Sequence, residues 1–191
     1  MKVLVVLCHP RRNSLTGQVA DALVAGLEEA GHEPELADLY GEGFDPALRE
    51  PDEPEWDRIG KVYSPEVLKE MARVARNEGI VLVSPIWWWS FPAMLKGWID
   101  RVFNKDWAYG SKKLPHRRAL IVGLSASDAP TYAGRGYDTA IETQQVIGVM
   151  NYCGIVDARY VYLHHSTDGG ARPAQMTAEA RELGLRFADG L

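Results

Sequence analysis

The stretch from residue 80 to residue 101 constrains the fold more than any other part of the chain. Residues 80–83 (Ile-Val-Leu-Val) are typical of a strand that is buried on both faces of a sheet. Ser84-Pro85 ends this strand, because proline has no N–H and restricts the residue before it. Residues 92–103 then carry apolar side chains at helical spacing, beginning with Pro92, which suits a first helical turn. The sequence between them is therefore predicted to be the turn at which a central strand passes into a helix.

Four aromatic residues, Trp87, Trp88, Trp89 and Phe91, occupy this turn. In an open parallel sheet, ligands bind in the crevice at the carboxyl ends of the strands. Four large rings on a short surface turn need a planar ligand or another subunit to cover them. Burial in the core is the alternative. We favour it for Trp98 on the following helix, but not for a run that has prolines at both ends.

The rest of the chain alternates between strand and helix patterns. Strands are predicted at residues 2–7, 35–39, 119–124 and 156–163. Helices are predicted from a Ser14 cap to Gly31, from a Ser64 cap and Pro65 onward, from an Asp138 cap through Ile141, Gln145 and Val149 to Gly154, and at residues 173–188. Residues 40–63 and 125–137 are expected to be long loops. The first is too long for an ordinary connection in a compact domain, which favours a functional or interface loop.

Five strands that alternate with five helices predict a doubly wound α/β domain with helices on both faces of a parallel sheet. Pro34 weakens the second strand, which places it at an edge. The strand order 2-1-3-4-5 of flavodoxin-like proteins fits this placement, with the third strand in the centre. At 191 residues, we expect one domain over residues 1–191.

Composition excludes several classes of protein. The net charge of −5 argues against a general nucleic-acid-binding surface. The two cysteines, Cys8 and Cys153, form no redox or metal motif, which favours a reducing cytoplasm. The chain begins with a strand pattern rather than a secretory leader, and it has no apolar run of membrane-spanning length. We therefore expect a cytoplasmic protein.

Three predicted loops, after the first, third and fourth strands, meet at one edge of such a sheet. The first offers helix-start amides with His9, Asn13, Ser14 and Thr16, which form a reasonable anion site. The aromatic turn offers a surface for a flat ring. A phosphate beside a flat ring describes a flavin nucleotide. A backbone hydrogen bond is an equally good role for His9.

Other ligand classes lack their motifs. The chain has no Gly-x-x-x-x-Gly-Lys-[Ser/Thr] loop, no Gly-x-Gly-x-x-Gly after the first strand and no Gly-x-Ser-x-Gly elbow. His164 and His165 are adjacent at the end of a predicted strand, and we find no further ligands that would make a metal site with them. We therefore predict no metal.

Three segments resemble a known family. Residues 8–16 read Cys-His-Pro-Arg-Arg-Asn-Ser-Leu-Thr, residues 85–103 read Pro-Ile-Trp-Trp-Trp-Ser-Phe-Pro-Ala-Met-Leu-Lys-Gly-Trp-Ile-Asp-Arg-Val-Phe, and residues 107–110 read Trp-Ala-Tyr-Gly. They resemble the flavodoxin-like NAD(P)H:quinone oxidoreductases, which include the DT-diaphorase type and the bacterial ancillary oxidoreductases of glutathione-gated potassium efflux. The resemblance covers nearly the whole chain, and the second segment is the most specific.

The resemblance implies roles for individual residues. The flavin would be bound by His9, Asn13, Ser14, Leu15, Thr16, Pro85, Ile86, Trp87, Trp88, Trp89, Gly123, Ser125, Ala126, Ser127 and Tyr132. Tyr132 and Tyr137 would be the catalytic residues, because the histidine that the mammalian type pairs with its tyrosine is missing from this loop. Family members are homodimers with the site at the subunit interface, so Trp107, Tyr109 and Trp89 would bind substrate.

The resemblance also implies the reaction, a ping-pong hydride transfer from NAD(P)H through the flavin to a quinone-like acceptor. The chain lacks the C-terminal extension that helps the longer mammalian enzymes bind FAD, which favours FMN over FAD. A flavin-binding regulatory subunit of a potassium efflux system is an alternative, and it would bring membrane contact through a transporter partner. A nitro- or azo-reductase and a flavodoxin-type electron carrier are two more.

Overall fold

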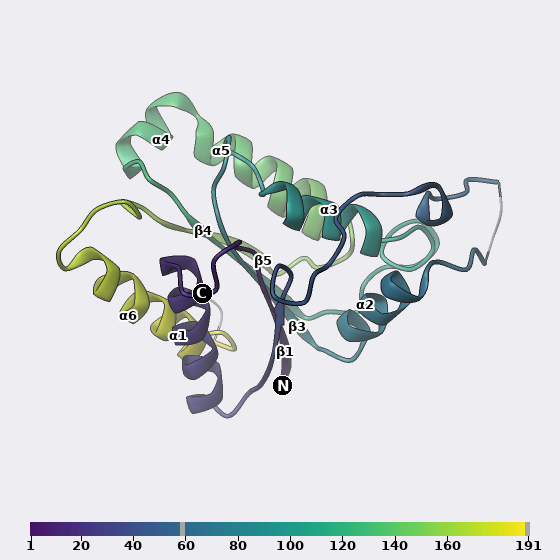
Figure 1. Ribbon diagram of the computed structural model, residues 1–191, viewed down its shortest axis with the longest axis horizontal. Helices are drawn as coiled ribbons and strands as arrows, with labels where there is room; N and C mark the ends of the chain where they lie inside the picture. Colours follow the sequence, from purple (N-terminus) through teal and green to yellow (C-terminus); the bar gives the residue numbers. More distant parts are fainter. Residues whose placement is uncertain (58–59, 190–191) are drawn as a thin grey trace.

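A computed structural model describes residues 1–57 and 60–189. Its sheet has the predicted parallel order β2-β1-β3-β4-β5. Helices lie on both sides of this sheet (Figure 1). The strands are β1 (Lys2–Leu7), β2 (Glu33–Asp38), β3 (Gly79–Pro85), β4 (Arg118–Leu124) and β5 (Ala158–Leu163). The central place of β3 is confirmed, and so is the edge place of β2, where Pro34 is tolerated because one side of the strand has no partner.

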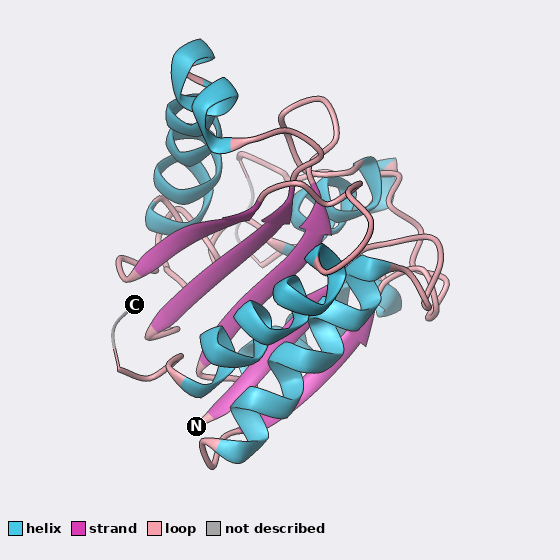
Figure 2. Cartoon of the chain, turned by 90° about the vertical axis from the view of Figure 1, so that its left-hand side faces the viewer, coloured by secondary structure: helices cyan, strands magenta, loops and turns pink. Residues whose placement is uncertain are grey.

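Helices cover both faces of this sheet. They are α1 (Leu15–Glu29), α2 (Pro65–Ala75), α3 (Ala93–Val102), α4 (Ala129–Arg135), α5 (Tyr137–Glu142) and α6 (Arg172–Leu185), with a π-helical run at Thr143–Asn151 that follows α5. Alternate residues of β1 and β3 point into two separate hydrophobic clusters. One cluster lies under α1 and α6, which run side by side across the front of Figure 2, and the other lies under α2, α3 and the π-helical run. Among the described residues, no helix is both long and apolar enough to cross a membrane.

The two helices α1 and α6 approach each other through glycines. A Cβ atom on Gly26 would lie 2.1 Å from the carbonyl oxygen of Arg181, and one on Gly184 would lie 2.3 Å from that of Leu23. Real Cβ atoms do not come this close, so only glycine allows the two backbones to touch. This contact fixes α6, and with it the segment after β5, relative to the start of α1.

The predicted helix starts at Ser14 and Ser64 are confirmed. The Ser14 hydroxyl accepts a hydrogen bond from the amide of Gly17 at 3.2 Å, and the Ser64 hydroxyl accepts one from the amide of Val67 at 3.5 Å. These bonds satisfy amides that have no partner inside the helix. Trp98 is fully buried, as expected.

The prediction of a loop at residues 125–137 is wrong, because α4 lies within it. The carboxylate of Asp128 accepts a hydrogen bond from the amide of Thr131 at 2.9 Å, and Pro130 follows the cap as helix starts prefer. Gly136, at φ 68°, ends this short helix and begins the next. Asp138 is therefore not a helix cap, and it lies in the first turn of α5 instead.

The helix predicted beyond Asp138 is only partly α-helical. From Thr143 to Asn151 it is a π-helix, which has more residues per turn. Gln145 and Met150 are buried in this run, whereas Val149 is half-buried. A spacing of four residues cannot distinguish the two helix types, so the change from α-helix to π-helix was not predictable from the sequence. The fifth strand also begins two residues later than predicted, and Val156 is 83% exposed.

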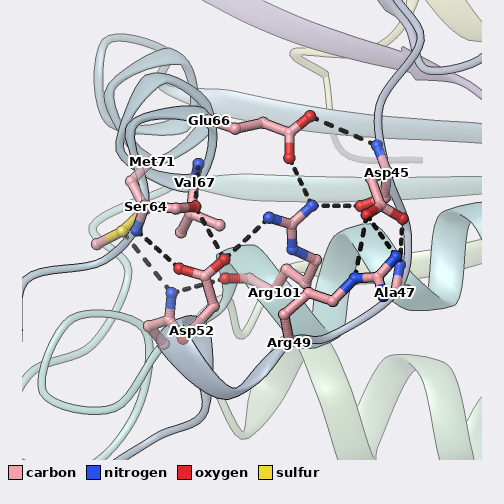
Figure 3. A network of polar contacts seen from close by, with 10 residues as sticks. Asp45, Ala47, Arg49, Asp52, Ser64, Glu66, Val67, Met71 and Arg101 are labelled. Carbon is pink, nitrogen blue, oxygen red and sulfur yellow. Dashed lines mark hydrogen bonds and ion pairs between the residues drawn. The ribbon is translucent and has the colours of Figure 1, made fainter.

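The described part of residues 40–63 contains one short 3₁₀ helix, at Glu50–Asp52, and is otherwise held by polar contacts. Residues 58–59 lie outside the described residues. Arg101 on α3 donates to Asp52 at 2.9 Å and to Glu66 at 2.6 Å, and it also donates to the carbonyl of Asp45 (Figure 3). Asp52 in turn accepts from the amide and hydroxyl of Ser64 at 2.7 and 2.8 Å. These contacts fix the segment to α2 and α3.

Candidate functional site

A cavity of about 200 Å³ lies where α1 begins. Its lining residues come from the loop after β1, the first turn of α1, the ends of β3 and β4, and the segment after β5. They are His9, Arg11, Ser14, Leu15, Thr16, Pro85, Leu124, Ser166 and Thr167. Five of the predicted cofactor-binding residues therefore meet in one place: His9, Ser14, Leu15, Thr16 and Pro85. Asn13 is exposed and does not line this cavity.

The cavity has the electrostatic character of an anion site. The amides of Leu15 and Thr16 open α1 and donate no hydrogen bond to any described residue. Together with the helix dipole, they favour a negative charge at this point. Arg11 lines the cavity, and no carboxylate does. The neighbouring Arg12 turns away to Asp21, at 3.0 Å.

His9 joins this cavity to the aromatic turn. Its Nδ1 lies 3.0 Å from the amide nitrogen and 3.1 Å from the carbonyl oxygen of Arg11, so the expected backbone hydrogen bond is present. Burial lowers the pKa of His9, which favours a neutral ring. The centroid of this ring lies 6.3 Å from that of Trp87.

Trp88 and Trp89 form the centre of a tight turn. Trp87 and Ser90 exchange backbone hydrogen bonds of 3.3 and 3.1 Å, and the two residues between them have φ of 51° and 53°. Two positive φ angles describe a type I′ turn, which usually takes glycine or asparagine. Each left-handed tryptophan costs about 1–2 kcal/mol. Such strain is tolerated where the surroundings over-determine it, which is often at functional sites.

The turn presents its indoles to solvent. Trp87 and Trp89 are each 42% exposed, and Trp88 is 88% exposed. Phe91 is different, because it is 7% exposed and belongs to the core, so our expectation that it joins the surface rings is wrong. Ile86 is held beside the turn by its amide, which donates to the carbonyl of Leu124 at 2.8 Å.

The two predicted catalytic tyrosines lie beside this turn. The ring of Tyr137 lies 4.4 Å from that of Trp89, and the ring of Tyr132 lies 5.8 Å from that of Tyr137. Tyr132 is buried, at 5% exposure. The π-helical run contributes as well, because Gln144 accepts a hydrogen bond from the hydroxyl of Ser90 at 3.2 Å.

His164 is a residue of this site that the sequence reasoning missed. Its ring lies 5.1 Å from that of Tyr132, and its Nδ1 lies 3.0 Å from the carbonyl oxygen of Ser127. A histidine therefore lies beside Tyr132, and it comes from the end of β5 rather than from the segment after β4. The available signal was its position directly after a predicted strand, at the same edge as the other loops.

The segment after β4 divides into buried and exposed residues. Gly123 and Ser125 are buried, and a Cβ atom on Gly123 would lie 2.0 Å from the hydroxyl of Tyr160, so this glycine makes room for that tyrosine. The hydroxyl of Ser125 donates to the carbonyl of Ser127 at 3.1 Å. Ala126 is exposed and Ser127 is half-buried, and neither residue lines the cavity at the start of α1.

The remaining predicted substrate-binding residues lie elsewhere in the chain. Trp107 lines a different cavity, of about 260 Å³, together with Met71 of α2. Tyr109 packs between Trp56 and Tyr152, at ring distances of 6.5 and 5.9 Å. Neither residue joins the aromatic turn of its own chain.

Comparison with known proteins identifies the family. The sequence profile of the family described as "Flavodoxin-like fold" matches residues 1–186. The chain belongs to this family. A relative named as the uncharacterised NAD(P)H oxidoreductase YcaK of Escherichia coli (strain K12) is 37% identical over 163 residues, which are 85% of this chain and 83% of that protein.

Two further similarities extend over almost the full length. An uncharacterised NAD(P)H oxidoreductase of Haemophilus influenzae (strain ATCC 51907 / DSM 11121 / KW20 / Rd) is 26% identical over 191 residues, which cover 95% of this flavodoxin-like chain and 94% of the relative. The solved structure of an NAD(P)H:quinone oxidoreductase from Methanothermobacter marburgensis has a TM-score of 0.92 at 25% identity, and the match covers 98% of this chain and 96% of that one.

Proposed function

We propose that this flavodoxin-like protein is a flavin-dependent NAD(P)H oxidoreductase that passes electrons to a quinone or a similar acceptor. One observation carries the proposal: the anion cavity and the exposed indole turn are neighbours, linked by His9 and Pro85 at the carboxyl edge of the sheet. The names of the relatives support the same reaction class.

The residues at the cavity suit the phosphate end of a flavin nucleotide. The free amides of Leu15 and Thr16 would bind phosphate oxygens, and Arg11 would pair with the charge. We favour FMN over FAD. The terminal phosphate of FMN carries up to two negative charges, whereas each phosphate in the pyrophosphate of FAD carries one, so FMN suits a compact anion site better. The cavity is also small, at about 200 Å³.

The residues at the turn suit the ring end. The amides of Trp88 and Trp89 donate to no other described residue, so they are available to polar atoms at a ring edge. Pro85, Ile86 and Trp87 would line the ring, and the exposed segment at Ala126 would close its far end. Exposed indoles also give a planar nicotinamide or quinone an apolar surface on which to stack.

When bound, the flavin supplies the hydride chemistry, and the protein supplies position and electrostatics. Tyr132 and Tyr137 would hold hydroxyl donors near the reacting ring and stabilise the negative charge that reduction produces. His164 would orient Tyr132 by edge-to-face contact with it. Trp107 and Tyr109 would act across the interface of a homodimer, because they lie apart from the site of their own chain.

Flavin titration with steady-state kinetics tests this proposal. The purified protein should bind FMN and oxidise NADH or NADPH in the presence of a quinone. A Tyr132→Phe variant should keep its flavin and turn over more slowly, by about tenfold or more, because it loses one donor. Protein that binds neither FMN nor FAD would refute the proposal. Flavin-loaded protein that consumes no NAD(P)H would instead be an electron carrier or a regulatory subunit.

A further inference from the structure

We propose that Ser166 and Thr167, which follow β5, complete the phosphate site of the flavin. This inference rests on the proposed function and adds phosphate ligands from the segment after β5. Both residues line the anion cavity together with Ser14, Leu15 and Thr16.

The position of these two residues is unexpected for their place in the sheet. β5 lies at the edge opposite β2, with β4 and β3 between it and β1. The segment after β5 nevertheless reaches the cavity at the start of α1. Leu124 and Pro85, at the ends of the two intervening strands, line the cavity between them. An anion at the start of α1 would therefore meet hydroxyl groups on its other side.

Backbone hydrogen bonds hold this segment in place. The amide of Ser166 donates to the carbonyl of Ser125 at 2.8 Å, and the amide of His165 donates to that of Ser127 at 3.3 Å. His165 has a φ of 65°, and the amide of Asp168 closes the turn by donating to its carbonyl at 3.1 Å. Arg172 of α6 donates to the carbonyl of His164 at 2.8 Å. The segment is thus fixed at both ends before any ligand binds.

The hydroxyls of Ser166 and Thr167 are free to bind a ligand. Neither has a hydrogen-bond partner among residues 1–57 and 60–189. Ser166 is half-buried and Thr167 is exposed. The hydroxyl of Ser14 accepts the amide of Gly17, and its own hydrogen is still available to donate. A phosphate monoester has three strong acceptor oxygens, and each of them can accept more than one hydrogen bond. Two helix-start amides and one arginine leave part of this capacity unused, so further donors would be used.

Comparison of FMN with riboflavin isolates this contact, because riboflavin has the same ring without the phosphate. The Ser166→Ala/Thr167→Val variant of the full chain should bind FMN about tenfold more weakly for each hydroxyl lost. Its affinity for riboflavin should not change. The affinities are measured by quenching of flavin fluorescence on titration with apoprotein, and circular dichroism checks that the variant is folded.

Two further variants make the test decisive. Thr167→Ser keeps a hydroxyl and should keep the preference for FMN, and Thr177→Val removes a hydroxyl from α6 outside the cavity and should change nothing. An unchanged preference for FMN over riboflavin in the double variant would overturn the inference and leave the proposed function intact. A wild-type protein that binds neither flavin would overturn both.

Discussion

At the scale of single residues, the turn at Trp88 and Trp89 holds two indoles on a left-handed backbone, with φ of 51° and 53°. Prolines on either side of the aromatic run indicated that the indoles do not belong to the core, and their exposure of 42% to 88% agrees. The left-handed backbone was not predictable, because tryptophan is unfavourable there and no local pattern signals it. Phe91 was missed because its direction depends on packing against the core.

Replacement of Trp88 tests this backbone geometry. Trp88→Gly should be more stable than Trp88→Ala by about 1 kcal/mol, because only glycine accepts a φ of 51° without strain. Both variants should bind FMN more weakly than the wild type, since both lose the exposed ring. Urea denaturation of the apoproteins measures the stabilities.

A matched pair in a helix gives the control for this comparison. Lys96 is an exposed position within α3. There Lys96→Ala should be more stable than Lys96→Gly by about 1 kcal/mol. If Trp88→Ala proves as stable as Trp88→Gly, residue 88 does not have a positive φ angle.

At the scale of elements, the sequence predicted every strand and both serine caps because those signals are local. It missed α4, which has only seven residues and one buried side chain, Tyr132, so it shows no periodicity. It missed the π-helical run, because Ile141 and Gln145 have the spacing of either helix type. Ser166 and Thr167 were missed because their place in the cavity depends on how the segment after β5 crosses two strand ends.

Gln145 makes the π-helical run testable. Its side chain is 1% exposed, and neither amide atom has a hydrogen-bond partner among the described residues. A buried polar group without a partner costs about 1–3 kcal/mol. Gln145→Met keeps the length of the side chain and should raise the free energy of unfolding by about 1 kcal/mol or more. Gln175→Met, at an exposed position on α6, should change it by less than about 0.5 kcal/mol. A destabilised Gln145→Met variant would contradict the description of this site.

The Arg101 network (Figure 3) makes a pH-dependent prediction. Burial by itself raises the pKa of Asp52, but hydrogen bonds from Arg101 and Ser64 hold that pKa below its ordinary value. The carboxylate therefore stabilises the fold above its unfolded pKa, and this contribution is lost as the pH falls through the lowered folded pKa. Asp52→Asn removes one of the two carboxylates that pair with the buried Arg101, while Glu66 remains, and it should cost about 2 kcal/mol at neutral pH.

The stability difference between wild type and Asp52→Asn should begin to shrink below about pH 4, where Asp52 of the unfolded wild type takes up a proton, and should shrink further as the folded carboxyl is protonated. Asp100→Asn breaks the exposed pair with Lys96 and should cost less than about 1 kcal/mol. Thermal unfolding across this pH range gives both comparisons. A difference for Asp52→Asn that does not change with pH would show that the ion pair is not what holds residues 40–63.

At the scale of the whole molecule, the parallel sheet brings together side chains that are distant in sequence. His9, Trp87, Tyr132, His164 and Thr167 follow four different strands, yet all of them lie at one edge. Strand order and the carboxyl-end rule were enough to predict the meeting of the first three. Trp107 lies apart from this edge and lines a different cavity, so its role in the site stays a prediction.

The central claim is that this edge binds a flavin that NAD(P)H reduces. Anaerobic titration of the FMN-loaded protein with NADH or NADPH, followed by visible absorbance, tests it most directly. We expect the oxidised flavin band to bleach stoichiometrically with at least one of the two donors and to return when a quinone is added. A flavin that stays oxidised with both donors, or protein that takes up no flavin, would contradict the account.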